Sequence, residues 1–397
     1  MSGMQPQRGL TIDPRVKGWC PGALRPMESG DGLVVRLRLP LGRMTPDTAR
    51  GIAAASRLHG SGQIELSGRG NLQLRGVNAA SHPALLSDLA ALGVLDPDLE
   101  TEARRNILIT PFRSAGGGAE ALARDLARRL MELPELPAKF GFVIDTGPQR
   151  HLAGSPGDLR LERGASGGLI LRADGAPLGV PVAAEGAISA LIDLAHWFVA
   201  SGGMVEGRGR MRALVARGIL PPGAAEAPAS LAAPAVPGPA DGGVLVGFEF
   251  GSFPAERLED LAALGRPMLL TPWRMILVEG LADLGRLAAI PGLILTPDSP
   301  LLRVRACPGA PFCPQALGPT RALARALAPH VPEGRLLHVS GCAKGCAHPL
   351  AADATLVATP GGYSIGRGQD AAEVRGAAMT AEAILQIPDI FDAERGL

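Results

Sequence analysis

Several features that would place a chain in a specialised class are missing from this sequence. Aromatic residues make up only 3% of its 397 residues, and the formal net charge is +1. A charge this close to zero provides no overall field for holding nucleic acid or an anionic membrane surface. No apolar run approaches the length that spans a bilayer, and the stretch MSGMQPQRGLTIDPR at the start lacks the apolar core of a secretory signal. We therefore expect a cytoplasmic protein that binds neither nucleic acid nor membrane.

Cysteine is also scarce, and its distribution is more informative than its number. The chain has five cysteines, an odd count for a disulfide framework, and four of them lie within residues 307–346. This distribution is typical of a reducing compartment in which thiolates bind metal. Gly (53) and Pro (36) are plentiful, and 46% of the residues are hydrophobic. The length predicts two or three domains with aliphatic cores and many tight turns.

The two halves of the sequence follow one plan. Each half is predicted to contain a strand, a helix and two returning strands, which together make half of a ferredoxin-like unit. In the first half these are GLVVRLRLP (32–40), a helix with Thr45 as N-cap and Pro46 in its first position, QIELSG (63–68) and NLQLRGV (71–77). In the second half they are GVLVGFEFG (243–251), PAERLEDLAALG (254–265) and the strands within 267–281.

A second correspondence follows at a constant offset. Asp158 matches Asp353 and Ile170 matches Ile365, each 195 residues apart, and Gly147 stands where the later copy has Cys342. We infer a duplication in which only the second copy carries metal. The predicted α+β architecture has six segments: an N-terminal extension (1–29), a ferredoxin-like half-domain (30–80), a metal-free α/β unit (81–220), a Pro/Ala/Gly linker (221–242), a second half-domain (243–285) and a metal-bearing α/β unit (286–397).

The cysteines form two pairs, in RACPGAPFCPQ (305–315) and HVSGCAKGCAHP (338–349). A [4Fe–4S] cube needs four thiolates that converge from different directions, and the surrounding Gly and Pro allow the sharp turns that aim them. Structural zinc sites usually separate paired cysteines by two to four residues, whereas the first pair here is separated by five. Buried structural cysteines and a zinc site are the alternatives. The predicted cluster ligands are Cys307, Cys313, Cys342 and Cys346.

The cysteine spacing and the duplicated plan resemble the nitrite and sulfite reductase superfamily, in which such pairs hold a [4Fe–4S] cube beside a siroheme. Within that superfamily the chain is most similar to the family of precorrin-3B synthases, and the similarity covers the chain from about residue 15 onwards. The segments that carry it, besides the cysteine pairs, are RVKGWCPGALRPMESGDGLVVR (15–36), SGRGNLQLRGV (67–77), LPAKFGFVIDTG (136–147) and LTPWRMILVEG (270–280). The resemblance implies oxygen-dependent hydroxylation of precorrin-3A at C-20, with a γ-lactone closed by the ring A acetate, in aerobic cobalamin synthesis.

The resemblance also implies a site for a tetrapyrrole whose edge carries carboxylates, which calls for basic side chains. The reductases have a second basic residue where this chain has Gly141, and this departure favours a site that grips a macrocycle over one that reduces a small anion. At positions that match the family, the predicted substrate-binding residues are Arg69, Arg105, Lys139 and Asn106, with Arg75 and Arg274 as weaker candidates.

Oxygen activation requires more than the cluster, because a cube with four thiolates has no open iron. The resemblance implies a separate mononuclear non-haem iron and an external electron donor. Non-haem oxygenases typically use two His and a carboxylate, but the seven histidines show no such spacing, so the iron ligands stay unassigned. Cys20 is expected to be structural or to shape the substrate site. His348 is expected to be structural, and Lys344 either raises the cluster potential or is solvated.

Two other functions remain open at this point. The first is a siroheme-dependent nitrite or sulfite reductase, against which the segment GWCPGALRPMESGDG and Gly141 both argue. The second is a non-enzymatic iron–sulfur subunit for electron transfer, which would not need two large duplicated halves with basic residues at ligand positions.

Overall fold

The computed structural model of the chain describes residues 20–387 and 389–392. They divide into two compact units, a first unit that ends at Asp298 and a second unit that begins at Ser299. Three β-sheets lie in the first unit and one lies in the second. This mixture of helices and strands confirms the α+β fold class. Within the described residues, no helix is both long and apolar enough to cross a membrane.

The first sheet contains the predicted strands of the first half and one strand from the second half. Along its second strand Val35 and Leu37 belong to the core, and the alternation places Arg36 on the opposite face. The sheet runs, in order and with antiparallel neighbours, through β1 (Met27–Ser29), β2 (Gly32–Leu37), β5 (Leu72–Val77), β4 (Gln63–Leu66) and β13 (Ser252–Pro254).

The second sheet repeats this arrangement with the halves exchanged. Its edge strand β3 comes from the first half, just as β13 joins the first sheet from the second half. The strands, in order, are β11 (Gly238–Ala240), β12 (Gly243–Phe248), β15 (Met275–Glu279), β14 (Met268–Leu270) and β3 (Arg43–Met44), and β16 (Leu293–Ile294) also pairs with β12.

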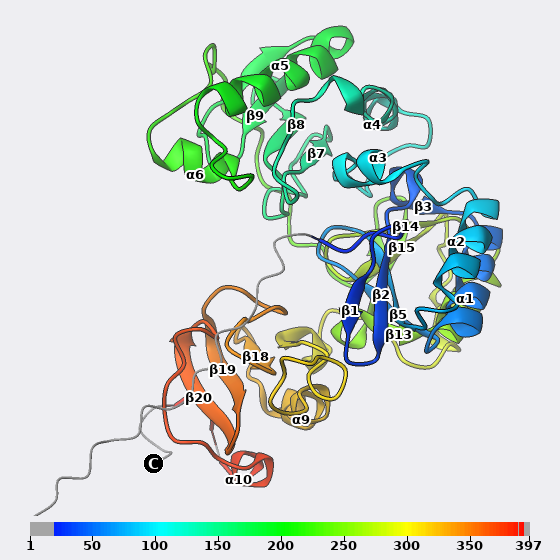
Figure 1. Cartoon of the computed structure of the whole chain (residues 1–397), viewed down its shortest axis with the longest axis vertical. Helices are drawn as coiled ribbons and strands as arrows, with labels where there is room; N and C mark the ends of the chain where they lie inside the picture. The colour runs from blue at the N-terminus through cyan, green and yellow to red at the C-terminus, as the bar shows by residue number, and fades with distance from the viewer. Residues whose placement is uncertain (1–19, 388, 393–397) are drawn as a thin grey trace, which may run out of the picture. The chain divides into compact units, whose positions relative to one another are not determined.

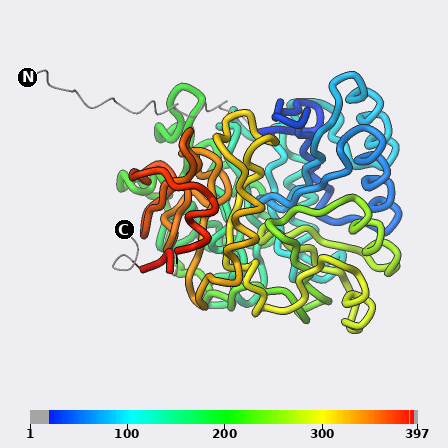
Figure 2. Tube along the Cα trace, turned by 90° about the horizontal axis from the view of Figure 1, so that it is seen from below, coloured from blue at the N-terminus to red at the C-terminus, as the bar shows by residue number. Residues whose placement is uncertain are grey.

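Both sheets and four helices share one apolar core. Thr45 caps the first helix as predicted, because its side chain accepts a hydrogen bond from the N–H of Thr48 at 3.2 Å and Pro46 follows in the first helical position. Figure 1 shows α1 and α2 along one side of the strands, and Figure 2 shows the blue and yellow-green halves side by side. The helices are α1 (Pro46–His59), α2 (His82–Ala91), α7 (Ala255–Ala262) and α8 (Leu284–Ala288).

A third sheet completes the first unit and has its own core, with helices α4 and α5 packed against it. Strands β6, β7 and β8 are parallel, and β9 and β10 continue the sheet antiparallel. The strands are β10 (Val180–Val182), β9 (Leu169–Ala173), β8 (Leu159–Arg163), β7 (Phe142–Asp145) and β6 (Ile107–Ile109). The helices are α3 (Leu99–Arg104), α4 (Gly118–Arg128), α5 (Ala187–Ala200) and α6 (Met211–Ala216).

The second unit repeats the third sheet in register. Phe142 pairs with Leu159 in the third sheet, and Leu337 pairs with Ala354 in the fourth, so both partners are shifted by the same 195 residues that the sequence indicates. The elements are β17 (Val304–Ala306), β18 (Leu337–Ser340), β19 (Ala352–Thr359), β20 (Gly362–Gln369), α9 (Arg321–Leu327) and α10 (Ala381–Leu385).

The Pro/Ala/Gly segment 221–242 is paired along part of its length. Single bridges join Gly179 to Glu226 and Gly164 to Pro228, and the segment ends in strand β11. These pairings hold it along the third and second sheets.

Candidate functional site

The four predicted cluster ligands lie in two loops of the second unit. Cys307 directly follows β17, and Cys342 and Cys346 lie in the loop after β18. Because β17 and β18 are parallel neighbours, their carboxyl ends meet at the same edge of the sheet. The sheet therefore brings the two cysteine loops together at that edge.

Backbone hydrogen bonds join the two loops around Gly341. Its N–H donates to Sγ of Cys307 at 3.2 Å, and its carbonyl accepts from the N–H of Leu317 at 2.8 Å. A side chain at this position has no room, since an added Cβ would lie 2.7 Å from Cβ of Ala316. The N–H of Cys313 donates to the carbonyl of Gly309 at 2.8 Å. These hydrogen bonds position the backbone of both cysteine loops.

The thiols are also close enough to influence one another's ionisation. Burial raises the pKa of Cys342, and the charges of Cys307 and Cys313 raise it further. For Cys346 the same causes raise the pKa to about 11, although the residue as a whole is exposed. Since exposure limits desolvation, we attribute more of that shift to repulsion among the thiolates. In both cases the ammonium group of Lys344 opposes the shift.

This donor set contains the four thiolates that a [4Fe–4S] cube uses as ligands. Across residues 20–387 and 389–392, no three His, Cys, Asp or Glu side chains close on one point as a single metal ion would require. A cube has no such requirement, because each thiolate binds a different iron. The N–H···S hydrogen bond from Gly341 is of the kind that stabilises a bound thiolate.

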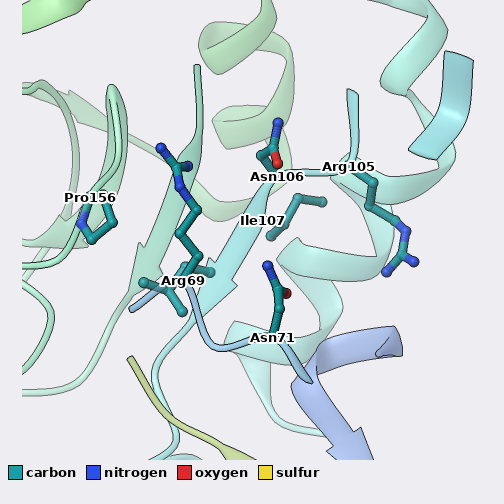
Figure 3. Close-up of a pocket in the computed structure, with 7 residues that line it drawn as sticks. Arg69, Asn71, Arg105, Asn106, Ile107 and Pro156 are labelled. Atoms are coloured by element: carbon teal, nitrogen blue, oxygen red, sulfur yellow. The ribbon is translucent and has the colours of Figure 1, made fainter. Parts of the chain in front are cut away.

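The four residues predicted to bind substrate lie in the first unit, and three of them line one pocket. This pocket is a small surface hollow between the turn after β4 and the start of β6. Figure 3 shows Arg69 and Asn106 facing it from opposite sides. The lining residues are Arg69, Asn71, Arg105, Asn106, Ile107, Leu108 and Pro156.

Two glycines lie next to Arg69: Gly70 follows it in the sequence, and Gly141 is close to its guanidinium. Gly70 adopts φ +64, which turns the chain sharply after Arg69. A Cβ on Gly141 would lie 3.4 Å from Nη1 of Arg69, so this residue and the guanidinium are near neighbours. Nη2 of Arg69 donates to the carbonyl of Lys139 at 3.1 Å. Gly141 and the carbonyl of Lys139 therefore both border the guanidinium of Arg69.

The other two basic candidates are placed differently. Nε and Nη2 of Arg105 donate to both oxygens of Asp96, at 2.5 and 2.8 Å, and its side chain points away from Arg69 in Figure 3. Lys139 is exposed and is not among the residues that line the pocket. Arg75 forms an ion pair with Asp31 at 2.8 Å on the first sheet. The sequence could not predict Asp96 and Asp31 as partners, because these contacts form only in the folded chain.

Cys20 and Arg36 add to the same region. Burial lowers the pKa of Arg36 to about 10, and the side chain of Cys20 partly opposes this shift. Nε and Nη2 of Arg36 donate to Oε1 of Gln73, a neutral acceptor, at 3.1 and 2.6 Å. Sequence analysis did not single out Arg36, although the alternation in GLVVRLRLP places it on the polar face of β2. Its guanidinium adds positive charge to the region around Arg69.

His348 has local contacts, and Arg274 has an unusual backbone conformation. Nε2 of His348 lies 3.3 Å from the carbonyl oxygen of Ala351, and its ring meets that of His338 at 5.8 Å between centroids. Arg274 adopts φ +61, the same conformation as Gly70 at the equivalent turn of the first sheet. These contacts are local and do not by themselves indicate a ligand.

Comparisons with known proteins agree with this architecture. The sequence profile described as "Nitrite/Sulfite reductase ferredoxin-like half domain" matches residues 25–92. A relative from Sinorhizobium sp named precorrin-3B synthase is 30% identical over an alignment of 395 residues, which covers 89% of this chain and 83% of the relative. The structure of the Mycobacterium tuberculosis NirA protein has a TM-score of 0.68 at 17% identity, and the match covers 89% of this chain and 79% of that one. At that identity the structural likeness shows the fold alone, and it confirms the predicted reductase-like architecture.

Proposed function

Because the chain belongs to the family of precorrin-3B synthases, we propose that it converts precorrin-3A into precorrin-3B in aerobic cobalamin synthesis. The observation that carries this proposal is the similarity to a relative of that name along 89% of the chain. The chain is therefore an enzyme, and we assign it an oxidoreductase reaction. In that reaction C-20 of the macrocycle is hydroxylated with dioxygen, and the ring A acetate closes a γ-lactone.

The proposed cofactor is a [4Fe–4S] cluster held by Cys307, Cys313, Cys342 and Cys346. The convergence of their two loops and the N–H···S hydrogen bond from Gly341 support this assignment. When bound, the cluster supplies single electrons to the reaction. An external donor has to deliver them, since hydroxylation with dioxygen consumes electrons and protons to turn the second oxygen atom into water.

A separate mononuclear iron is the part of the proposal with no residues attached to it. In the part of the chain that the structure describes, no set of three His, Cys, Asp or Glu side chains is arranged to share one ion. We therefore assign no ligands to such an iron and derive no step through it.

The substrate's peripheral carboxylates are proposed to bind at the pocket beside Arg69. Arg69, Asn71 and Asn106 line this pocket together, so a carboxylate at its mouth would meet one guanidinium and two amide groups. Burial lowers the pKa of the Arg69 guanidinium, so an anion that enters would offset the cost of its buried charge. Asn71 and Asn106 can add neutral hydrogen bonds to the carboxylate. Thiolate ligands persist in a reducing compartment, so we place the enzyme in the cytoplasm.

The test begins with anaerobically purified protein. We expect iron–sulfur absorption, no siroheme in an acid–acetone extract, and conversion of precorrin-3A to a product heavier by one oxygen atom when oxygen and a reductant are present. Extractable siroheme at a stoichiometry near that of the cluster would instead make this chain a nitrite or sulfite reductase. Binding of precorrin-3A without conversion would favour the non-enzymatic electron-transfer protein.

A further inference from the structure

Asp158 holds two segments beside Arg69 that are far apart in sequence. The residue is completely buried, with 0% of its surface exposed. Its Oδ2 accepts a hydrogen bond from the N–H of Gly141 at 3.0 Å, and its Oδ1 accepts from Nε of Arg210 and the N–H of Met211, both at 2.9 Å. The carboxylate thus fixes the loop that carries Arg210 against the turn that borders Arg69.

The charges in this arrangement are not balanced. Arg69 and Arg210 are two guanidinium groups, and Asp158 supplies one carboxylate that already accepts three hydrogen bonds. Nη1 of Arg69 lies 3.4 Å from where a Cβ on Gly141 would stand, and the carboxylate that binds the N–H of Gly141 also binds Arg210, so both guanidinium groups border one turn. Two guanidinium groups beside one carboxylate, which is bound to Arg210 and not to Arg69, favour a further anion.

Arg210 also has donors to spare. Its Nε is bound to Asp158, and none of the described residues accepts a hydrogen bond from Nη1 or Nη2. Its side chain is 38% exposed, so these groups can reach a ligand. Arg105 is less suited to bind this ligand, because its Nε and Nη2 already donate to Asp96.

We propose that Arg69 and Arg210 together bind one peripheral carboxylate of a tetrapyrrole, with Asp158 as the positioning residue that holds Arg210. This inference rests on the proposed function and adds a residue to it. It assigns a ligand role to the loop of residues 202–210, which sequence analysis left without one. Each arginine contributes charge-assisted hydrogen bonds from a different segment, so the carboxylate is gripped from two directions.

The test uses the full-length protein and two probes, uroporphyrin III with free carboxylates and its octamethyl ester, titrated by fluorescence. For Arg210→Gln we expect the affinity for the free acid to fall about tenfold, the effect of one charge-assisted interaction, and the ester to be unaffected. Arg69→Gln should cause a similar loss, and the double variant should lose less than the product of the two. Arg208→Gln is the matched control, because Arg208 is an exposed arginine of the same loop.

The outcomes separate this inference from the function on which it rests. If wild type prefers the free acid and Arg210→Gln binds it as tightly as wild type, the role of Arg210 is wrong while the proposed function stands. If wild type binds neither probe, both are contradicted. Arg210→Lys keeps the charge with fewer donors and should recover part of the affinity. Recovery by lysine in a variant with an unchanged thermal melt would separate carboxylate binding from a purely structural role.

Discussion

At one row of equivalent positions, the first ferredoxin-like sheet of the first unit carries polar side chains and the second carries leucines. In the first sheet Arg36 pairs with Gln73, and Gln73 pairs with Glu65, across three strands. In the second sheet the same register is occupied by leucines, each 1% exposed: Leu245, Leu277 and Leu269. Both rows face away from the shared core. A duplicated fold therefore keeps its core face constant and is free to change the other.

Each outer row is satisfied in its own way. In the first sheet, Arg36 donates to Gln73 and the side-chain amide of Gln73 donates to Glu65 at 3.4 Å, which leaves a polar face beside the Arg69 pocket. In the second sheet the leucine row is covered by Phe112, Trp273 and small residues from the segment before β12. The first sheet thus offers hydrogen-bonding groups to a ligand, whereas the second uses the same positions for packing.

The α/β copies differ in the same manner. The loop from Asp145 to Asp158 is as long as the loop from Ser340 to Asp353. Cys342 and Cys346 are therefore equivalent to Gly147 and His151 of the earlier copy. The ring of His151 packs against Phe112 at 4.4 Å between centroids, where the second unit gathers thiols instead. The first half has the basic pocket and the second half has the two cysteine pairs.

The largest expected effect tests whether only the second α/β copy binds the cluster. Cys342→Ser should abolish both the iron–sulfur absorption and turnover, because a cube that loses one of four thiolates is not retained. The matched variant is Gly147→Ser at the equivalent position, where an added Cβ meets nothing nearer than 3.5 Å. It should keep both properties. A Cys342→Ser protein that turns over without a cluster would contradict the assigned cofactor.

The second prediction exchanges one residue between the two sheets. Leu277→Gln puts an amide into a fully packed row and should cost about 3 kcal/mol of unfolding free energy, measured by urea denaturation. The reverse change, Gln73→Leu, should cost only about 1 kcal/mol and should weaken uroporphyrin binding, since Arg36 loses the acceptor that orients it. Equal costs for the two variants would mean that the rows do not differ as the side chains indicate.

These pairs also mark what the sequence could and could not predict. Alternation and capping were sufficient for β2, β5 and the start of α1 at Thr45, because local patterns determine them. The 195-residue offset indicated a duplication, and equivalent residue pairs of the two α/β sheets do differ by 195. The pairing of Arg105 with Asp96 could not be predicted in this way, since an arginine chooses its partner only in the folded chain.

In the candidate pocket, too, some residues could be predicted from the sequence and others could not. Arg69 and Asn106 were named from sequence and lie on its walls. Arg210 gave no signal, because it reaches Arg69 only through Asp158, which lies 52 residues away in the chain. Lys139 was selected by its match to the family, yet only its backbone carbonyl contacts Arg69.

The third prediction concerns the backbone contact between the cysteine loops. Gly341→Ala should cost about 2 kcal/mol of stability in the second unit, because the new Cβ would lie 2.7 Å from that of Ala316. The shift should also weaken the hydrogen bond to Cys307 and lower the iron content after reconstitution. The equivalent residue of the earlier copy is Thr146, and Thr146→Ala should leave the iron content unchanged. Full iron loading of Gly341→Ala would show that the loops tolerate separation.

The smallest expected effect comes from Asp145, whose counterpart in the second unit is the neutral Ser340. Burial raises the pKa of Asp145 and the nearby carboxylate of Glu162 adds to the shift, while the N–H of Leu152 opposes it. A raised pKa means that the folded state binds this proton more tightly than the unfolded state, so ionisation at neutral pH lowers stability and the loss disappears as pH falls below the unfolded pKa. Asp145→Asn keeps an acceptor for Leu152, at 2.7 Å in the parent, and removes the charge. It should raise the melting temperature at pH 7 by the equivalent of at most about 1 kcal/mol and change it little near pH 4. A variant that is less stable at pH 7 would mean that the charge of Asp145 is needed, and the earlier copy would then have kept an electrostatic role that its serine counterpart has lost.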